Sequence, residues 1–336
     1  LDANATSAPT RALILRPGVN FTGNTRYIVA LRSMKDGMGT VIVPPADFLA
    51  YRDNTPLADP VKEARRPHME TLFTTLAAAG VPRNDLYLAW DFTVASQRNL
   101  TERLLFVRDD GFARLGVNAP VFTVTTVEND VDSRIYRRVS GTFEVERYVN
   151  STAPGARFVL DANGLPTHQA TPQVAPFQCI IPRAALATAT DPAVPARASI
   201  YGHGLLGSHT EVGSGNVRDM ANEHNFVFCA TKWIGMSEDD VSNAIGILQN
   251  FSNFPTLTDR LQQGMLDQLF LARLMIHASG FVSHAAFQDQ FGAPVIDPSA
   301  VFYDGNSQGG IFGGTVMAIA QDITRGVLGV PGMNYS

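Results

Sequence analysis

The chain has 336 residues, of which 45% are hydrophobic and 17% charged, and its formal net charge is -5. This length allows more than one domain, at roughly 100–200 residues per domain. The acidic balance argues against a nucleic-acid-binding protein, which would present a basic face, and no apolar run approaches the ~18 residues of a membrane-spanning helix.

Residues 1–97 are predicted to form a β-rich domain with a helical insert. Turn-forming segments, "NFTGN" and "KDGMG", separate short runs rich in β-branched and aromatic residues. The predicted strands are Arg11–Pro17, Thr25–Arg32, Gly39–Pro45 and Leu86–Ser96.

The helical insert begins at Asp59, which suits the capping position, and Pro60 suits the first helical position. We expect Pro67 to divide this helix into two pieces, and Gly80 with Pro82 to end it. Four apolar residues recur at helical spacing: Met69, Leu72, Phe73 and Leu76.

Residues 98–130 are predicted to connect two domains, through one helix and one strand-like run, "VFTVTTV". From residue 131, antiparallel strands lead into alternating strands and helices. Short apolar strands that alternate with helices predict an α/β fold, a mostly parallel sheet flanked by helices, over 131–336. The predicted strands of this part are Ser199–Gly202, Phe226–Trp233, Val301–Asp304 and Gly326–Val330.

The stretch Gly305-Asn306-Ser307-Gln308-Gly309 matches G-x-S-x-G between a predicted strand and a predicted helix. In this turn the serine side chain projects from the sheet edge, and glycines leave room for the chain to pass itself. The pattern predicts Ser307 as a nucleophile, shaped by Gly305 and Gly309. It also predicts that the Gln308 N–H, at the helix start, stabilises an oxyanion.

A second glycine motif, "YGHGLLGS" at 201–208, has two interpretations. Its glycines match the dinucleotide fingerprint, but no helix follows directly and no acid ends the next strand. The alternative is an oxyanion loop, in which His203 and Gly204 bend the chain so that the Leu205 N–H faces the nucleophile. We favour the loop because it makes both motifs parts of one site.

Three strings in this order, "GHGLLG", "FVFCATKWIGM" and "GNSQGG", resemble an α/β-hydrolase of the bacterial lipase and esterase type. The N-terminal strings "RYIVALRSMKDGMG" and "AWDFTVAS" resemble the Ig-like domain that precedes the catalytic domain in secreted bacterial lipases. The resemblance implies a secreted or cell-envelope serine carboxylic-ester hydrolase without a cofactor, acting on a small-molecule or lipid ester. A signal segment is not present in this chain.

The catalytic base is the open question, because all seven histidines precede Ser307. In the resembled family the acid and the histidine lie after later strands, yet only Asp322 follows here. We therefore expect the chain to be a fragment that lacks both. His209 or His284 would be the internal alternatives.

Other candidates have ordinary structural interpretations. Trp233 ends a strand beside the loop and is a candidate substrate-binding residue, or a core or rim residue. Ser237 and Asp240 match a helix-capping box. Phe251 with Phe254 could edge an acyl site or pack in the core, and Cys179 with Cys229 could be buried thiols or a disulfide of an exported protein.

No metal is predicted, because residues such as Asp161 and His168 lack metal-ligand spacing. The sequence leaves the oligomeric state and substrate open. Two alternatives to ester hydrolysis also stay open. The first is acyl transfer or peptide hydrolysis on the same fold, and the second is a non-catalytic surface or binding protein that retains the serine turn.

Overall fold

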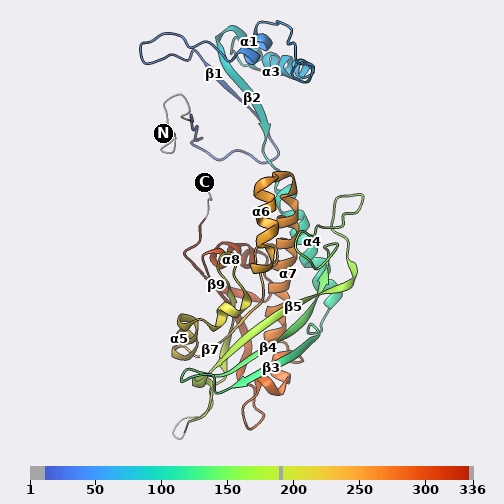
Figure 1. Cartoon of the computed structure of the whole chain (residues 1–336), viewed down its shortest axis with the longest axis vertical. Coiled ribbons are helices and arrows are strands. Elements are labelled where there is room, and N and C mark those ends of the chain that lie inside the picture. Colours follow the sequence, from blue (N-terminus) through green and yellow to red (C-terminus); the bar gives the residue numbers. More distant parts are fainter. Residues whose placement is uncertain (1–11, 189–191, 333–336) are drawn as a thin grey trace. The chain divides into compact units, whose positions relative to one another are not determined.

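The computed structural model describes residues 12–188 and 192–332 (Figure 1). The chain divides into two compact units, Leu1–Thr101 and Glu102–Ser336.

The first unit contains a two-stranded antiparallel ribbon of β1 (Arg26–Arg32) and β2 (Leu86–Thr93). Its helices are α1 (Ala46–Arg52), α2 (Pro60–Glu63) and α3 (Arg66–Ala78). Eight buried side chains form one core between the helices and the ribbon: Phe48, Tyr51, Met69, Leu72, Phe73, Leu76, Leu86 and Ala89.

The helical insert follows its sequence signals. The Asp59 carboxylate accepts from the backbone N–H groups of Val61 and Lys62, which caps α2. The helix breaks before Pro67, which lies in the first turn of α3, and Gly80 follows α3 with a φ of +76° that favours glycine.

The prediction of an Ig-like domain is wrong for the described residues. Of the four predicted strands, only β1 and β2 form; Arg11 lies outside the described residues, 12–17 form no strand, and 39–45 contribute only the bridge between Lys35 and Val41. An Ig-like sandwich needs two packed sheets, whereas helices cover this ribbon.

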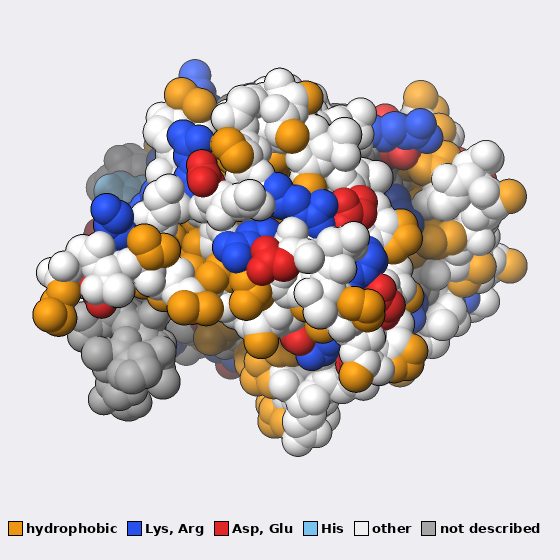
Figure 2. All heavy atoms as spheres, turned by 90° about the horizontal axis from the view of Figure 1, so that it is seen from above, with side chains coloured by type: hydrophobic (Ala, Val, Ile, Leu, Met, Phe, Trp, Pro, Cys, Tyr) orange, Lys and Arg blue, Asp and Glu red, His pale blue; other side chains and the backbone are white. Residues whose placement is uncertain are grey.

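On the face in Figure 2, acidic and basic side chains lie next to each other rather than forming one basic stripe.

The second unit is built on a seven-stranded sheet in the order β3-β4-β5-β7-β6-β8-β9. Pairings from β3 to β7 are antiparallel and those from β7 to β9 are parallel, so five strands share one direction. The predicted α/β fold is confirmed. The strands are β3 (Phe122–Asn129), β4 (Ile135–Arg147), β5 (Gln169–Pro182), β6 (Ala196–Gly202), β7 (Phe226–Ala230), β8 (Ile296–Asn306) and β9 (Ile323–Gly329).

The sequence predicted residues 98–130 as a connection between two domains, whereas residues 102–130 belong to this second unit. The helix α4 (Gln97–Leu115) buries Val107 and Phe112 in its core, where Phe112 meets Phe270 with ring centroids 5.3 Å apart. β3 is paired along its length with β4. An apolar helix face and an unpaired strand both need a partner, and the sheet provides one for each.

Helices cover both faces of the sheet. The core on one face includes Val217 and Ala221 of α5 (Gly215–Glu223). The larger core on the other face includes α7 (Pro255–Ile276) and α8 (Gln308–Ile319), while α6 (Val241–Gln249) precedes α7. Because β6 and β8 are parallel neighbours, with Gly202 opposite Gly305, their carboxyl ends meet at one edge of the sheet.

Cys179 and Cys229 form a disulfide across the antiparallel pair β5 and β7. Both side chains are fully buried. Of the two interpretations that the sequence left open, the pair of free thiols is wrong.

Candidate active site

Ser307 is the single residue between the end of β8 and the start of α8. Its φ of 54° and ψ of -116° are an unusual conformation for a residue with a side chain. Such a conformation costs on the order of 1–3 kcal/mol and marks functional sites. Ser307 is exposed at the edge of the sheet, so its hydroxyl is presented to solvent, as a nucleophile requires.

The glycines around Ser307 allow the chain to approach itself closely. A Cβ on Gly305 would lie 2.8 Å from the carbonyl carbon of Gly309, and a Cβ on Gly309 would lie 2.1 Å from the carbonyl oxygen of Gly202. Neither position has room for a side chain. Gly314 differs, since its Cβ would lie 3.8 Å from the nearest atom, a Leu328 methyl carbon.

The side chain of Tyr303 packs against this turn. Its side chain is buried, and its hydroxyl donates a 2.5 Å hydrogen bond to the carbonyl oxygen of Gly309. A Cβ on Gly202, Gly305 or Gly313 would lie within 2.6 Å of a Tyr303 side-chain atom. Burial raises the pKa of Tyr303, so the phenol stays protonated and continues to donate.

In the loop after β6, the successive backbone N–H groups of Gly204, Leu205 and Leu206 differ in their partners. The Gly204 N–H donates to Oε2 of Glu211 over 3.0 Å, and the Leu206 N–H donates to Oε1 of Gln308 over 3.3 Å. Within the described part of the chain, the Leu205 N–H has no hydrogen-bond partner. It is therefore available to a ligand.

The side chain of Gln308 ties this loop to its surroundings. It is 1% exposed, and its Nε2 donates to the carbonyl oxygen of Met236 over 2.9 Å. The backbone N–H of Gln308 opens α8 and has no partner among the described residues. Two free amides, those of Leu205 and Gln308, thus lie on turns joined by one side chain.

His203 holds the loop with both ring nitrogens. Nδ1 donates to the carbonyl oxygen of Gly204 over 2.9 Å, and Nε2 accepts from the Trp233 N–H over 2.9 Å. The ring is fully buried, and burial lowers its pKa. A neutral imidazole with both nitrogens engaged shapes the turn and has no nitrogen left to act as a base.

Trp233 lies in the core rather than in a substrate pocket. Its side chain has no exposed surface and packs against Phe312, with ring centroids 5.5 Å apart. The predicted substrate contact of Trp233 is therefore wrong for this structure. The residue acts through its backbone N–H, which fixes His203.

No described histidine hydrogen-bonds to Ser307. His209 lies beside the hydroxyl of Ser208, at 3.2 Å, and burial lowers its pKa to about 4. His284 caps a short turn by accepting from the Ala286 N–H, and its ring contacts Phe122. Asp322 is engaged by Arg273 in a 2.8 Å ion pair, and none of these three residues hydrogen-bonds to Ser307 in the described part of the chain.

Asp240 has the structural role that its capping pattern predicts. With Ser237 it forms the capping box, and its other oxygen forms a buried 2.8 Å ion pair with Arg260.

The sequence left two interpretations for Phe251 and Phe254, the edge of an acyl site or packing in the core. The two residues are 68% and 47% exposed. They are not core residues.

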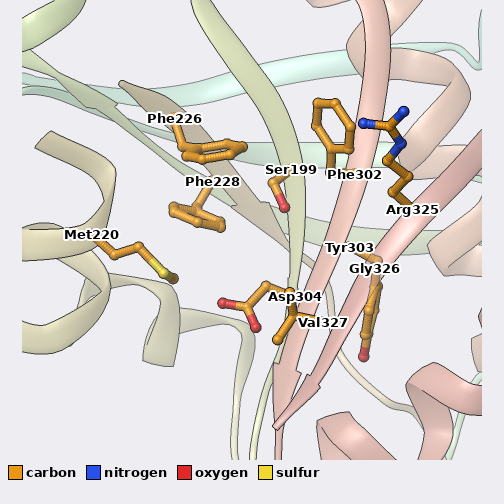
Figure 3. A pocket seen from close by; sticks show the side chains of 10 residues that line it. All are labelled: Ser199, Met220, Phe226, Phe228, Phe302, Tyr303, Asp304, Arg325, Gly326 and Val327. Atoms are coloured by element: carbon orange, nitrogen blue, oxygen red, sulfur yellow. The ribbon is translucent and has the colours of Figure 1, made fainter. Parts of the chain in front are cut away.

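A separate cavity of about 220 Å³ opens on the face of the sheet that α5 partly covers (Figure 3). Phe226, Phe228 and Phe302 supply much of its apolar wall, and Asp304 enters it from β8. Burial raises the pKa of Asp304.

No group of three metal-binding side chains occurs among the described residues, and none of their helices has the length and apolarity to cross a bilayer.

Two residues that support the site were missed from the sequence. Glu211 holds Gly204 and also accepts from the hydroxyl of Tyr201 over 3.0 Å. Tyr303 lies under the serine turn. No motif marks Glu211, but the glycines that flank the serine turn indicate that a large neighbouring side chain needs space.

No protein-family model matches the chain, and no curated protein does. Solved structures similar to it include acetyl xylan esterase 1 from Thermoanaerobacterium sp. JW/SL YS485, with 14% identity and a TM-score of 0.38. A protein from Bacteroides fragilis NCTC 9343, described provisionally as an acetyl xylan esterase, has 10% identity and a TM-score of 0.32. A glucuronoyl esterase from Solibacter usitatus has 13% identity and a TM-score of 0.27.

The three matches cover 69%, 67% and 61% of this chain and 58%, 53% and 50% of those proteins, respectively. The chain thus spans little more than half the length of the structures it matches.

Proposed function

We propose that this chain carries the nucleophile and the oxyanion hole of a serine carboxylic-ester hydrolase, of the esterase or lipase type. The observation that carries the proposal is the conformation of Ser307. It is strained and exposed, and it lies in a turn tied to the loop that offers a second free amide. A purely structural glycine turn has no need for a strained serine at its tip.

In the proposed reaction, Oγ of Ser307 attacks the carbonyl carbon of the ester and transfers its proton to a base. The N–H groups of Leu205 and Gln308 stabilise the negative charge that develops on the carbonyl oxygen, and one such donor is worth about 2.7–4 kcal/mol. The alcohol leaves with the proton, and water then releases the acid from the acyl-enzyme. We propose that the histidine and its acid come from residues outside this chain, since no described histidine contacts Ser307.

Labelling of the full-length protein with a fluorophosphonate tests this function. We expect one adduct, located at Ser307 by peptide mass spectrometry. The variant Ser307→Ala should lose it, whereas the exposed-serine control Ser279→Ala should retain it. An absent adduct, or one that survives Ser307→Ala, contradicts the proposal.

We further propose that the protein works outside the reducing cytoplasm, as an exported bacterial enzyme. Support comes from the buried Cys179–Cys229 disulfide, because disulfides persist mainly in oxidising compartments.

A further inference from the structure

The helix α6 presents an apolar stripe to solvent. Val241, Ile245 and Leu248, spaced by four and three residues, are 37%, 52% and 72% exposed. This spacing places them on one face of the helix. Phe251 and Phe254 continue the exposed apolar surface beyond its end.

The opposite side of α6 is anchored, so the stripe faces outward in a fixed orientation. Ile247 is buried at 3% exposure, and Nδ2 of Asn243 donates to Oγ1 of Thr256 over 3.1 Å. In an ordinary surface helix the apolar face is the buried one. Here an apolar face remains in solvent while the other face packs.

This surface is also uncharged. No acidic or basic residue occurs from 241 to 258. Of the charged residues just before the helix, Glu238 and Asp239 are paired with Lys232 at 3.0 and 2.7 Å, and Asp240 is buried in its 2.8 Å ion pair with Arg260. A surface of this kind suits an apolar, uncharged ligand rather than bulk water.

The segment that leads into α6 is fixed to both turns of the candidate site. The carbonyl oxygen of Met236 accepts from the Gln308 side chain, and the Glu238 N–H donates to the carbonyl oxygen of Gly207 over 2.9 Å. On the same loop the Leu205 side chain is 61% exposed. The helix thus starts beside the site and extends about 10 Å from Val241 to Leu248, at 1.5 Å per residue.

We infer that the outward face of α6, with Phe251 and Phe254, binds the acyl chain of the ester substrate. This inference rests on the proposed function and adds a substrate class: esters with an extended apolar acyl group. The uncharged stripe is continuous with the segment that holds the two glycine turns, and this continuity favours an acyl chain over a second protein.

A binding measurement tests the inference without requiring turnover. The full chain carrying Ser307→Ala is titrated with 11-(dansylamino)undecanoic acid, followed by dansyl fluorescence. The added pair Ile245→Ser and Leu248→Ser should raise Kd about tenfold or more, since one methylene in an apolar site is worth tenfold or more. Val117→Ser, at an 88% exposed position of the same unit, is the control and should leave Kd within about twofold.

In the full-length enzyme, the same pair should lower the kcat/KM ratio of octanoyl to acetyl esters about tenfold. An unchanged Kd, an unchanged ratio, or a parent dimer that the pair converts to a monomer would overturn the inference. If no ester is cleaved but the pair still abolishes dansyl binding, the hydrolase proposal fails and the apolar binding surface stands.

Discussion

Oε1 of Gln308 accepts a hydrogen bond from the backbone N–H of Leu206 over 3.3 Å. One side chain from the start of α8 thereby determines the position of the loop after β6. The neighbouring N–H of Leu205 has no partner among the described residues. Because the Gln308 contact fixes the loop, it also sets the direction in which this N–H points. The distance between the two proposed oxyanion donors therefore depends on the Gln308 side chain, which is 1% exposed and hydrogen-bonds to protein groups at both polar atoms.

Gln308→Ala should lower kcat about tenfold to a hundredfold with little change in KM. The backbone amide of residue 308 remains, but the loop loses its tether, and a misplacement of about 1 Å can cost this much. Steady-state kinetics of the protein on a short acyl ester would measure the change in kcat. The exposed Gln321→Ala is the control; a rise in KM alone would show that Gln308 holds substrate instead.

Gly309→Ala and Gly314→Ala should change stability in opposite directions. At Gly309 the new Cβ would lie 2.1 Å from the Gly202 carbonyl oxygen, so we expect a loss of about 1–3 kcal/mol or more. At Gly314 the space is open, and replacing glycine inside α8 should add about 0.5–1 kcal/mol. Urea unfolding of both variants provides the measurement, and equal effects would mean that the packing of the turn is misassigned.

Asp267→Asn should remove part of the pH dependence of stability. Asp267 is fully buried on α7, and burial raises its pKa to about 7. The folded state therefore keeps a proton that the unfolded state loses above pH ~4. The free energy of unfolding should fall as pH rises from about 4 to 7, and then level off.

At pH 8 the asparagine variant should be more stable than the parent by up to about 4 kcal/mol, which corresponds to the shift of about three pKa units. At pH 4 the two proteins should be nearly equal. Denaturant unfolding across this range measures the difference, with the exposed Glu223→Gln as control. Parallel curves for parent and variant would contradict a raised pKa.

Reduction should destabilise the second unit. The bonded cysteines are 50 residues apart, and cross-linking a loop of this length stabilises a fold by about 4 kcal/mol in the chain-entropy model. Urea unfolding with and without dithiothreitol would measure the loss. The pair Cys179→Ala and Cys229→Ala should show no response to the reductant, and an unaffected parent would argue against the disulfide.

Much of the fold was predictable because its signals are local. The cap at Asp59 and the strand-turn-helix around Ser307 depend on neighbours a few residues away, so their patterns identify them directly. The same reasoning failed at 39–45, where apolar and β-branched residues form no regular strand. A strand needs a partner from elsewhere in the chain, and its own sequence cannot provide one.

The sequence by itself determined the alternation of strands and helices in the second unit, the position of the serine turn and the glycines that this turn requires. Only the tertiary structure decided that β3 completes the main sheet, that Trp233 is buried, and that Glu211 and Gln308 leave the Leu205 amide free. The physical reason is that these features depend on contacts between distant segments. Which side chains are buried, and which groups pair in hydrogen bonds, is decided only when distant segments of the chain pack together.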